Sequence, residues 1–172
     1  MKLSDTREIA ASPEEVWAAI LSPEVLKECI PGCESLTGSI ENGYEAVVKQ
    51  KVGPVSATFT GLVQLSEIAP GKSLKISGEG KGGVAGFAKG GADVRFEPFE
   101  GGTRLTYEVE ANVGGKIAQL GSRIIDSFAK KLADEFFTRF QAAVEEPEEE
   151  ATDEAVAESG EKTKGWFRRL LG

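Results

Sequence analysis

Five stretches between residues 44 and 113 alternate apolar and polar side chains with a period of two, and this alternation constrains the fold more than any other feature. The stretches are 44–52, 55–68, 73–81, 87–98 and 103–113. One face of each carries mainly apolar or small residues, and the opposite face carries mainly Lys, Arg, Asp, Glu and Thr. This pattern is typical of an antiparallel sheet with one dry and one solvated face.

Helical patterns lie on both sides of these stretches. Residues 2–11 predict a first strand, and Ser12-Pro13-Glu14-Glu15 then has the form of a capping box with proline at the first helical position. Ser22-Pro23-Glu24 repeats this signal for a second short helix. From Gly115 to Val144, apolar residues recur at spacings of three and four, which predicts a long amphipathic helix. The predicted class is α+β: a curved antiparallel sheet of about seven strands around a long C-terminal helix, with two short helices after the first strand.

One region of the dry face consists of small residues, although a packed core normally requires large ones. This region is the 76–92 hairpin, and its small residues are Gly78, Gly80, Ala88, Gly90 and Ala92. Three interpretations stay open. The helix packs closely here, glycine curves the strands, or an apolar space remains for a ligand.

The loop of this hairpin, GEGKGGVAGFAKGG, contains seven glycines. Gly78, Gly80 and Gly83 match G-x-G-x-x-G, but a dinucleotide site needs this motif between a parallel strand and a helix. Strands are expected on both sides here, so we interpret the loop as a flexible gate or a wide hairpin. Val84 and Phe87 at its tip are available to a ligand, a membrane or a partner protein.

Composition argues against several kinds of site. The 172 residues include 28 acidic side chains, 20 basic ones and no histidine, so the net charge is −8. This balance argues against nucleic-acid binding, and the lack of imidazole removes the commonest catalytic base and metal ligand. Carboxylates such as Glu79 and Glu108 fall on solvated strand faces, so we expect neither catalytic residues nor a metal site. Cys29 and Cys33 lack C-x-x-C spacing, and we interpret them as thiols in a structural turn, with a reactive role as the alternative.

Charge divides the chain into three segments. Residues 1–144 form the expected globular domain, and residues 145–161, with nine acidic and no basic side chains, predict a flexible acidic linker. Residues 162–172 combine four basic side chains with apolar ones, which predicts a short amphipathic tip that contacts a membrane or, alternatively, a partner protein. The expected membrane contacts of this tip are Lys164, Trp166, Phe167, Arg168, Arg169, Leu170 and Leu171.

No apolar stretch approaches the roughly 20 residues of a transmembrane helix, and the N-terminus lacks the apolar segment of a signal peptide. The expected location is therefore the cytoplasm, with peripheral attachment to the inner face of the cell membrane.

The chain contains, in this order, the blocks KLSDTREIAASPEEVWAAI, EVLKECIPGCESL and SGEGKGGVAGFAKGGADV. Together they resemble the CoxG family of carbon monoxide dehydrogenase accessory proteins, and the similarity covers about residues 1–144. That family belongs to the START-like (SRPBCC) superfamily of helix-grip folds. The resemblance implies an apolar ligand cavity between sheet and helix.

The resemblance also implies a function. The expected protein is a non-enzymatic accessory of a molybdenum-containing carbon monoxide dehydrogenase or related hydroxylase. It would bind a respiratory quinone of the menaquinone or ubiquinone type as its ligand, without a catalytic cofactor, and carry it between membrane and enzyme. The alternatives are a membrane-recruitment adaptor that carries no ligand and a small polyketide cyclase-like enzyme.

We expect the N-terminal half of the long helix to face the cavity and its entrance, opposite the hairpin tip and the second short helix, and the C-terminal half to be fixed core. The expected cavity residues are Leu26, Ile30, Phe59, Ile76, Gly78, Val84, Phe87, Gly90, Ala92, Tyr107, Ile117, Leu120, Gly121, Ile124 and Phe128.

Overall fold

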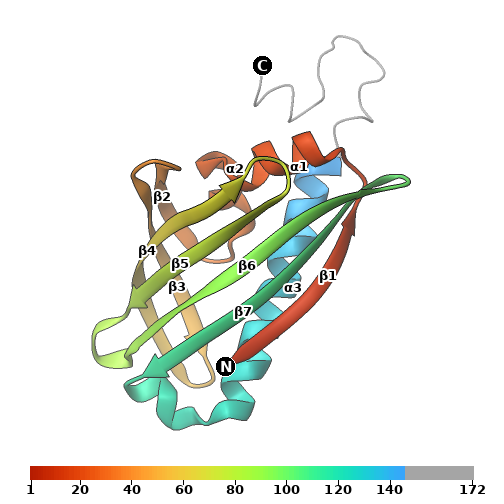
Figure 1. Cartoon of the computed structure of the whole chain (residues 1–172). Helices are drawn as coiled ribbons and strands as arrows, with labels where there is room; N and C mark the ends of the chain where they lie inside the picture. Colours follow the sequence, from red (N-terminus) through yellow and green to blue (C-terminus); the bar gives the residue numbers. More distant parts are fainter. Residues whose placement is uncertain (146–172) are drawn as a thin grey trace.

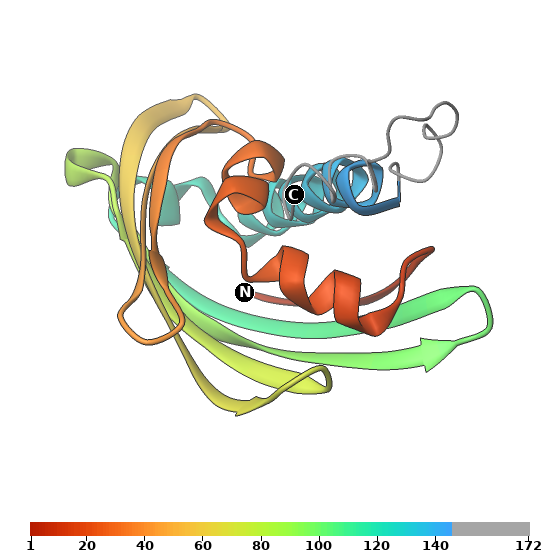
Figure 2. The same ribbon diagram turned by 90° about the horizontal axis from the view of Figure 1, so that it is seen from above.

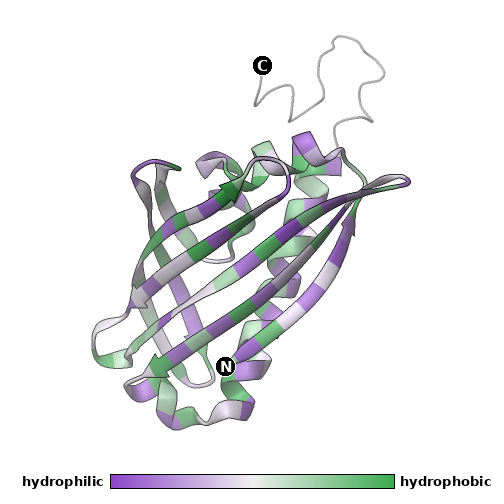
Figure 3. Cartoon of the chain, viewed as in Figure 1, coloured by the Kyte–Doolittle hydropathy of each residue, from purple (hydrophilic) through white to green (hydrophobic). Residues whose placement is uncertain are grey.

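A computed structural model describes residues 1–145, which form one antiparallel sheet of seven strands with helices on its concave side (Figure 1). The strand order is β1-β7-β6-β5-β4-β3-β2, so the first and last strands of the chain are neighbours. The strands are β1 (Lys2–Ile9), β2 (Cys33–Ser39), β3 (Gly43–Val52), β4 (Val55–Ala69), β5 (Ser73–Lys81), β6 (Phe87–Phe99) and β7 (Gly102–Gly114). Along the long strands β6 and β7, hydrophobic and hydrophilic residues alternate, as Figure 3 shows.

Two short helices and one long helix accompany the sheet. They are α1 (Pro13–Ile20), α2 (Pro23–Cys29) and α3 (Ser122–Glu145). Two short 3-10 helices, η1 (Gly83–Ala85) and η2 (Lys116–Leu120), lie in connections. Seen from above, the sheet curves around α3, with α1 and α2 beside it (Figure 2). The predicted α+β helix-grip architecture is therefore confirmed.

The predicted capping signals are also confirmed. The Ser12 hydroxyl accepts a hydrogen bond from the Glu15 backbone N–H at 3.2 Å, and the Glu15 carboxylate accepts one from the Ser12 N–H at 3.1 Å. At α2, the Ser22 hydroxyl accepts from the Val25 N–H at 3.3 Å. These bonds satisfy N–H groups that a helix start leaves without partners, and so they fix where both helices begin.

The predicted start of the long helix at Gly115 is wrong. Gly115 has a φ of +83° and Gly121 a φ of +96°, and these two residues separate η2 from its neighbours. Left-handed φ values interrupt a right-handed helix, and glycine adopts them without steric cost. The regular helix therefore begins at Ser122 and continues to Glu145, the first residue of the expected linker.

The packed core lies at one end of the domain, where α1, α2 and the C-terminal half of α3 meet the sheet (Figure 1). Its largest fully buried side chains are Phe140, Ile9, Leu105 and Val16. All buried residues of α3 lie in its C-terminal half, namely Phe137, Phe140 and Val144.

An arginine on the edge strand connects the sheet to α3. The Arg7 guanidinium donates to Asp134 at 2.6 Å and to the Tyr107 hydroxyl at 3.3 Å, and it lies 5.0 Å from the centre of the Phe137 ring. Tyr107 in turn stacks on Phe137, with ring centres 5.2 Å apart. This half-buried cluster fixes β1 against the middle of α3.

Lowering the pH is expected to remove the stabilisation that Asp134 gives to this contact. Hydrogen bonds from Arg7 and Lys130 hold the pKa of Asp134 below its usual value. Such a carboxylate stabilises the fold above its unfolded pKa, about 3.9, and this contribution is lost as the pH falls through the folded pKa. In urea unfolding at several pH values, the advantage of the wild type over Asp134→Asn should therefore shrink below about pH 4. An advantage that is equal at about pH 6 and about pH 3 would contradict this account.

The expected acidic linker beyond Glu145 and the amphipathic tip lie outside the described residues. None of the helices in the part of the chain that the structure describes is both long and apolar enough to span a bilayer.

Candidate ligand-binding site

The strand face that points toward α3 is unevenly covered. Near α1 and α2, its side chains are buried, as at Leu74, Phe96 and Leu105. Toward the other end, its residues remain half-buried, so solvent reaches them. These positions, which we call the half-buried inner face, are Ala57, Phe59, Gly61, Val63, Gly78, Gly80, Ala88, Gly90, Ala111 and Val113.

The N-terminal half of α3 is similarly uncovered. Phe128 and Leu132 are half-buried, and Ile124 is 38% exposed. The start of this half lies against the β3–β4 turn, because a Cβ added at Gly53 would be 3.5 Å from Ile124 Cγ2. The apolar surfaces of the sheet and of α3 are thus both incompletely buried in the same half of the domain.

The small residues on the inner face lie in two different structural environments. A row of small residues crosses four strands in register, with Ala46 paired to Gly61, Gly61 to Gly80, and Gly80 to Ala88. A Cβ added at Gly80 would meet only Thr60 O at 4.0 Å, so a methyl group fits there without a clash. At Gly90, by contrast, an added Cβ would collide with the Glu110 carbonyl oxygen of β7. The close approach of the β7 backbone therefore requires glycine at position 90, whereas no such crowding requires it at position 80.

Polar side chains on this side of the sheet are already hydrogen-bonded within the chain. The Tyr44 hydroxyl donates to Leu21 O at 2.8 Å, and Gln50 Nε2 donates to Pro31 O at 2.7 Å. The Tyr107 hydroxyl accepts from Arg7. Because these groups are satisfied, the half-buried inner face offers mainly apolar surface, which suits an apolar ligand.

The structure places the other predicted cavity residues in different surroundings. Ile76 and Ala92 are half-buried next to the core, Tyr107 belongs to the packed cluster over Phe137, and Ile117 is buried in η2. Gly121 is exposed at the break before α3. Leu120 is half-buried at the end of η2.

The expected position of the second short helix is wrong. Leu26 and Ile30 are half-buried, but their helix, α2, packs against the C-terminal half of α3. Cys29 belongs to the same buried cluster as Phe140, and the nearby charge of Arg139 acts to lower the pKa of its thiol. The short connection from α1 to α2 keeps both helices at the packed end, so Leu26 and Ile30 do not lie opposite the hairpin tip (Figure 1).

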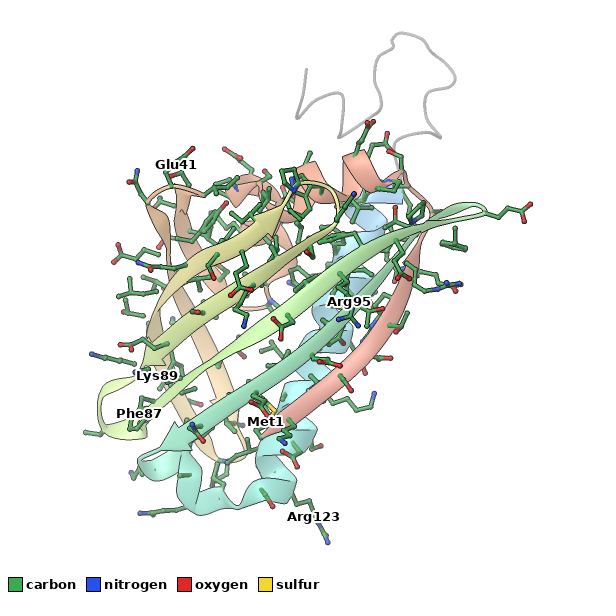
Figure 4. The ribbon with its side chains drawn as sticks, viewed as in Figure 1. Met1, Glu41, Phe87, Lys89, Arg95 and Arg123 are labelled. Atoms are coloured by element: carbon green, nitrogen blue, oxygen red, sulfur yellow. The ribbon has the colours of Figure 1, made fainter. Side chains whose placement is uncertain are left out.

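The tip residues lie outside the inner face. Val84 in η1 is 88% exposed. Phe87 is 48% exposed and has the strand position of Lys89, on the solvated face, where its ring packs on Gly114. Figure 4 shows Phe87 and Lys89 close together at this end of β6. Both residues can meet a partner surface, but they do not line the space beneath α3.

Phe137 and Arg7 were not among the candidate residues predicted from the sequence. Phe137 belongs to a second apolar line on the helix, Phe137, Phe140 and Val144, whose spacings of three and four were a usable signal. Arg7 gave no such signal, because only the packing of α3 on β1 brings it to Asp134.

The cysteines behave as buried structural thiols. Burial raises the pKa of Cys29 to about 11 and also raises the pKa of Cys33. The Cys33 thiol, which is half-buried, donates to Ser35 O at 3.3 Å. Both thiols are therefore protonated near neutral pH, which favours the structural interpretation over the reactive one.

The strand carboxylates pair with lysines on the solvated face. Glu110 lies 3.3 Å from Lys2, Glu79 lies 3.5 Å from Lys81, and Asp93 lies 3.7 Å from Lys75. A hollow of about 920 Å³ is bordered by β1, β5, β6 and β7 with several of these charged side chains, and no residue of α3 lines it. The hollow also touches Gly90 and Ala111 of the half-buried inner face, but most of its lining is polar or charged, unlike the apolar surface beneath α3.

Comparisons with known proteins agree with this arrangement. Residues 6–145 match the family model that describes CoxG of carbon monoxide dehydrogenase. A conserved protein from Geobacillus kaustophilus is 30% identical, over 84% of this chain and 95% of that one, with a TM-score of 0.79. No curated protein matches the chain.

More distant solved structures share the fold. A START superfamily protein from Mycobacterium smegmatis is 16% identical, over 84% of this chain and 97% of that one, with a TM-score of 0.62. A protein from Chromobacterium violaceum is 17% identical, over 84% of this chain and 98% of that one, also with a TM-score of 0.62. The domain therefore has a START-like fold.

Proposed function

Because the chain belongs to the CoxG family, whose members are accessory to carbon monoxide dehydrogenase, we propose that it carries a respiratory quinone between the membrane and a molybdenum-containing form of that enzyme. In this role the chain binds and presents the quinone and catalyses no reaction itself. The observation that carries the proposal is the half-buried inner face, an apolar surface that α3 leaves incompletely covered.

The physical argument concerns the isoprenoid tail of the quinone. Each buried CH₂ is worth about 0.8 kcal/mol, so a long tail does not leave the bilayer for water. An apolar surface on the protein makes the transfer from lipid nearly neutral in free energy. The row Ala46, Gly61, Gly80 and Ala88 carries no side chain larger than a methyl group, which supports the proposal, and the polar groups described above are already hydrogen-bonded.

Quinone extraction tests this function directly. The purified full chain is incubated with vesicles that contain menaquinone, the vesicles are removed by sedimentation, and quinone in the protein fraction is measured by chromatography and native mass spectrometry. We expect a chain–quinone complex of defined mass. A chain that acquires no quinone but still binds vesicles and the dehydrogenase would be a recruitment adaptor, and the carrier function would be wrong.

The C-terminal residues supply the membrane contact in this proposal. Replacing Trp166 and Phe167 together by aspartate in the full chain is expected to weaken sedimentation with anionic vesicles by about tenfold or more, because the apolar anchor is lost. Thermal unfolding of the domain should not change. If the double variant sediments as strongly as the wild type, these residues are not the anchor.

A further inference from the structure

Three connections of the chain meet at one end of the domain, opposite the end that α1 and α2 cover (Figure 1). They are η1, η2 and the β3–β4 turn at Gly53. Gly86 and Gly115 bring η1 and η2 into contact, since a Cβ added at Gly115 would collide with the Gly86 backbone. A Cβ at Gly53 would lie 3.6 Å from Leu120 Cδ1. We call these connections, together with Phe87 at the start of β6 and the first turn of α3, the loop end.

The loop end exposes large apolar side chains. Val84 is 88% exposed, Phe87 is 48% exposed, and Ile124 in the first turn of α3 is 38% exposed. Such exposure contributes little to folding, because apolar surface stabilises a state only when it is removed from water. Exposed apolar side chains that gather in one region of a domain mark interaction sites for proteins or membranes.

Basic side chains accompany these apolar residues. They are exposed and lie on the segments that meet at the loop end, namely Lys51, Lys81, Lys89, Lys116 and Arg123. Figure 4 shows Lys89 and Arg123 extending outward there. Within residues 1–145, the ion pair of Lys81 with Glu79 at 3.5 Å is the only one that involves any of the five. The loop end is therefore basic, although the chain as a whole has a net charge of −8.

We propose that the loop end docks on the surface of a membrane that contains anionic lipids. Val84, Phe87 and Ile124 then reach the boundary between headgroups and acyl chains, and the surrounding cations pair with the headgroups. The inference rests on the proposed function, since a carrier must meet the bilayer, and it adds which end of the domain does so. The half-buried inner face continues to this end, because Ala57 and Phe59 follow the β3–β4 turn and Gly80 precedes η1.

The acidic segment starts on the opposite side of the domain. The 24 residues of α3 run from the loop end to Glu145, and such a helix is about 36 Å long. Residues 146–161 carry eight acidic side chains, so their connection begins far from the anionic headgroups that would repel them. These sixteen residues can span at most about 55 Å, so the amphipathic residues beyond them can reach the same bilayer.

The test uses the full chain and vesicles of phosphatidylcholine with phosphatidylglycerol that contain no quinone. Val84→Asp is expected to weaken vesicle binding by at least about tenfold, because it places a carboxylate at the lipid boundary. Leu62→Asp is the matched control, since Leu62 is 51% exposed in the middle of β4, and it should bind as the wild type does. Each substitution is also made together with the Trp166→Asp and Phe167→Asp changes, so that the C-terminal residues do not mask the effect.

Charge reversal provides a second measurement. Lys116→Glu with Arg123→Glu should weaken binding to anionic vesicles by about tenfold or more and leave binding to pure phosphatidylcholine unchanged. The proposal is overturned if Val84→Asp binds vesicles as strongly as the wild type, both alone and together with the Trp166→Asp and Phe167→Asp changes. If this variant instead loses only capture of the dehydrogenase, the loop end is a protein interface and the membrane assignment is wrong.

Binding of a short-chain, water-soluble quinone separates this inference from the proposed function. Variants that no longer bind vesicles but still bind this quinone support both the docking surface and the carrier function. If vesicle binding by the wild type depends on Val84 but the wild type binds no quinone, the docking surface stands and the carrier function is wrong. If the wild type binds quinone but Val84→Asp does not weaken vesicle binding, the carrier function stands and the docking surface is wrong.

Discussion

Replacement of Gly80 by leucine is expected to weaken quinone binding by about 10- to 100-fold while the domain stays folded. An added Cβ at Gly80 meets only Thr60 O at 4.0 Å, so the backbone accepts a side chain there, and we expect the leucine to extend from the inner face toward α3. A quinone tail in the same space must then overpack it, which costs about 1–3 kcal/mol, and each 1.4 kcal/mol is about tenfold in affinity. Menaquinone uptake from vesicles measures the change in affinity, because this quinone has a full tail, and urea unfolding measures the stability.

Two further leucine substitutions make this result specific. Ser77 is exposed on the opposite face of the same strand, so Ser77→Leu adds the same side chain without entering the interior and should leave binding unchanged. Gly90→Leu should destabilise the domain strongly, because its Cβ collides with the Glu110 carbonyl oxygen of β7. Loss of stability in Gly80→Leu comparable to that in Gly90→Leu, with unchanged quinone binding, would mean that the region around Gly80 is packed core.

The strands and helix starts could be predicted because their signals are local. Alternation fixes which side chain faces α3, and the serines at positions 12 and 22 satisfy N–H groups within their own helices. The break before α3 was not predicted, because apolar spacing continues through Gly121 while its φ of +96° depends on the connection from β7. The spacing of apolar residues predicts which face of a helix is buried, but it does not predict whether the helix is interrupted.

The candidate site was harder to predict, because the same residue type is required for different structural reasons at different positions. Gly80 and Gly90 are both small residues on the inner face, yet one has open space in front of it and the other has the backbone of β7. A sequence contains no distances between strands and could not separate these cases. The placement of Leu26 and Ile30 failed for the same reason, since the direction in which α2 packs depends on tertiary contacts.

Two phenylalanine truncations on α3 are expected to separate stability from binding. Phe140→Ala should lower the free energy of unfolding by about 3–5 kcal/mol, because Phe140 is 0% exposed and its removal leaves a cavity in the packed core. Phe128→Ala should cost at most about 1 kcal/mol, because this side chain is only half-buried. Urea unfolding compares the two losses within one helix, with the same atoms removed.

Quinone binding should respond in the opposite order. Phe128 lies in the half of α3 that the sheet leaves uncovered, so its truncation removes apolar contact from a bound tail and should lower the affinity by about tenfold or more. The folded fraction of Phe140→Ala should bind as the wild type does, since Phe140 packs with Phe137 and Val144 away from that surface. If Phe140→Ala loses quinone affinity while Phe128→Ala retains it, the ligand occupies the end covered by α1 and α2. In that case the exposed loop end is not the route by which the ligand enters.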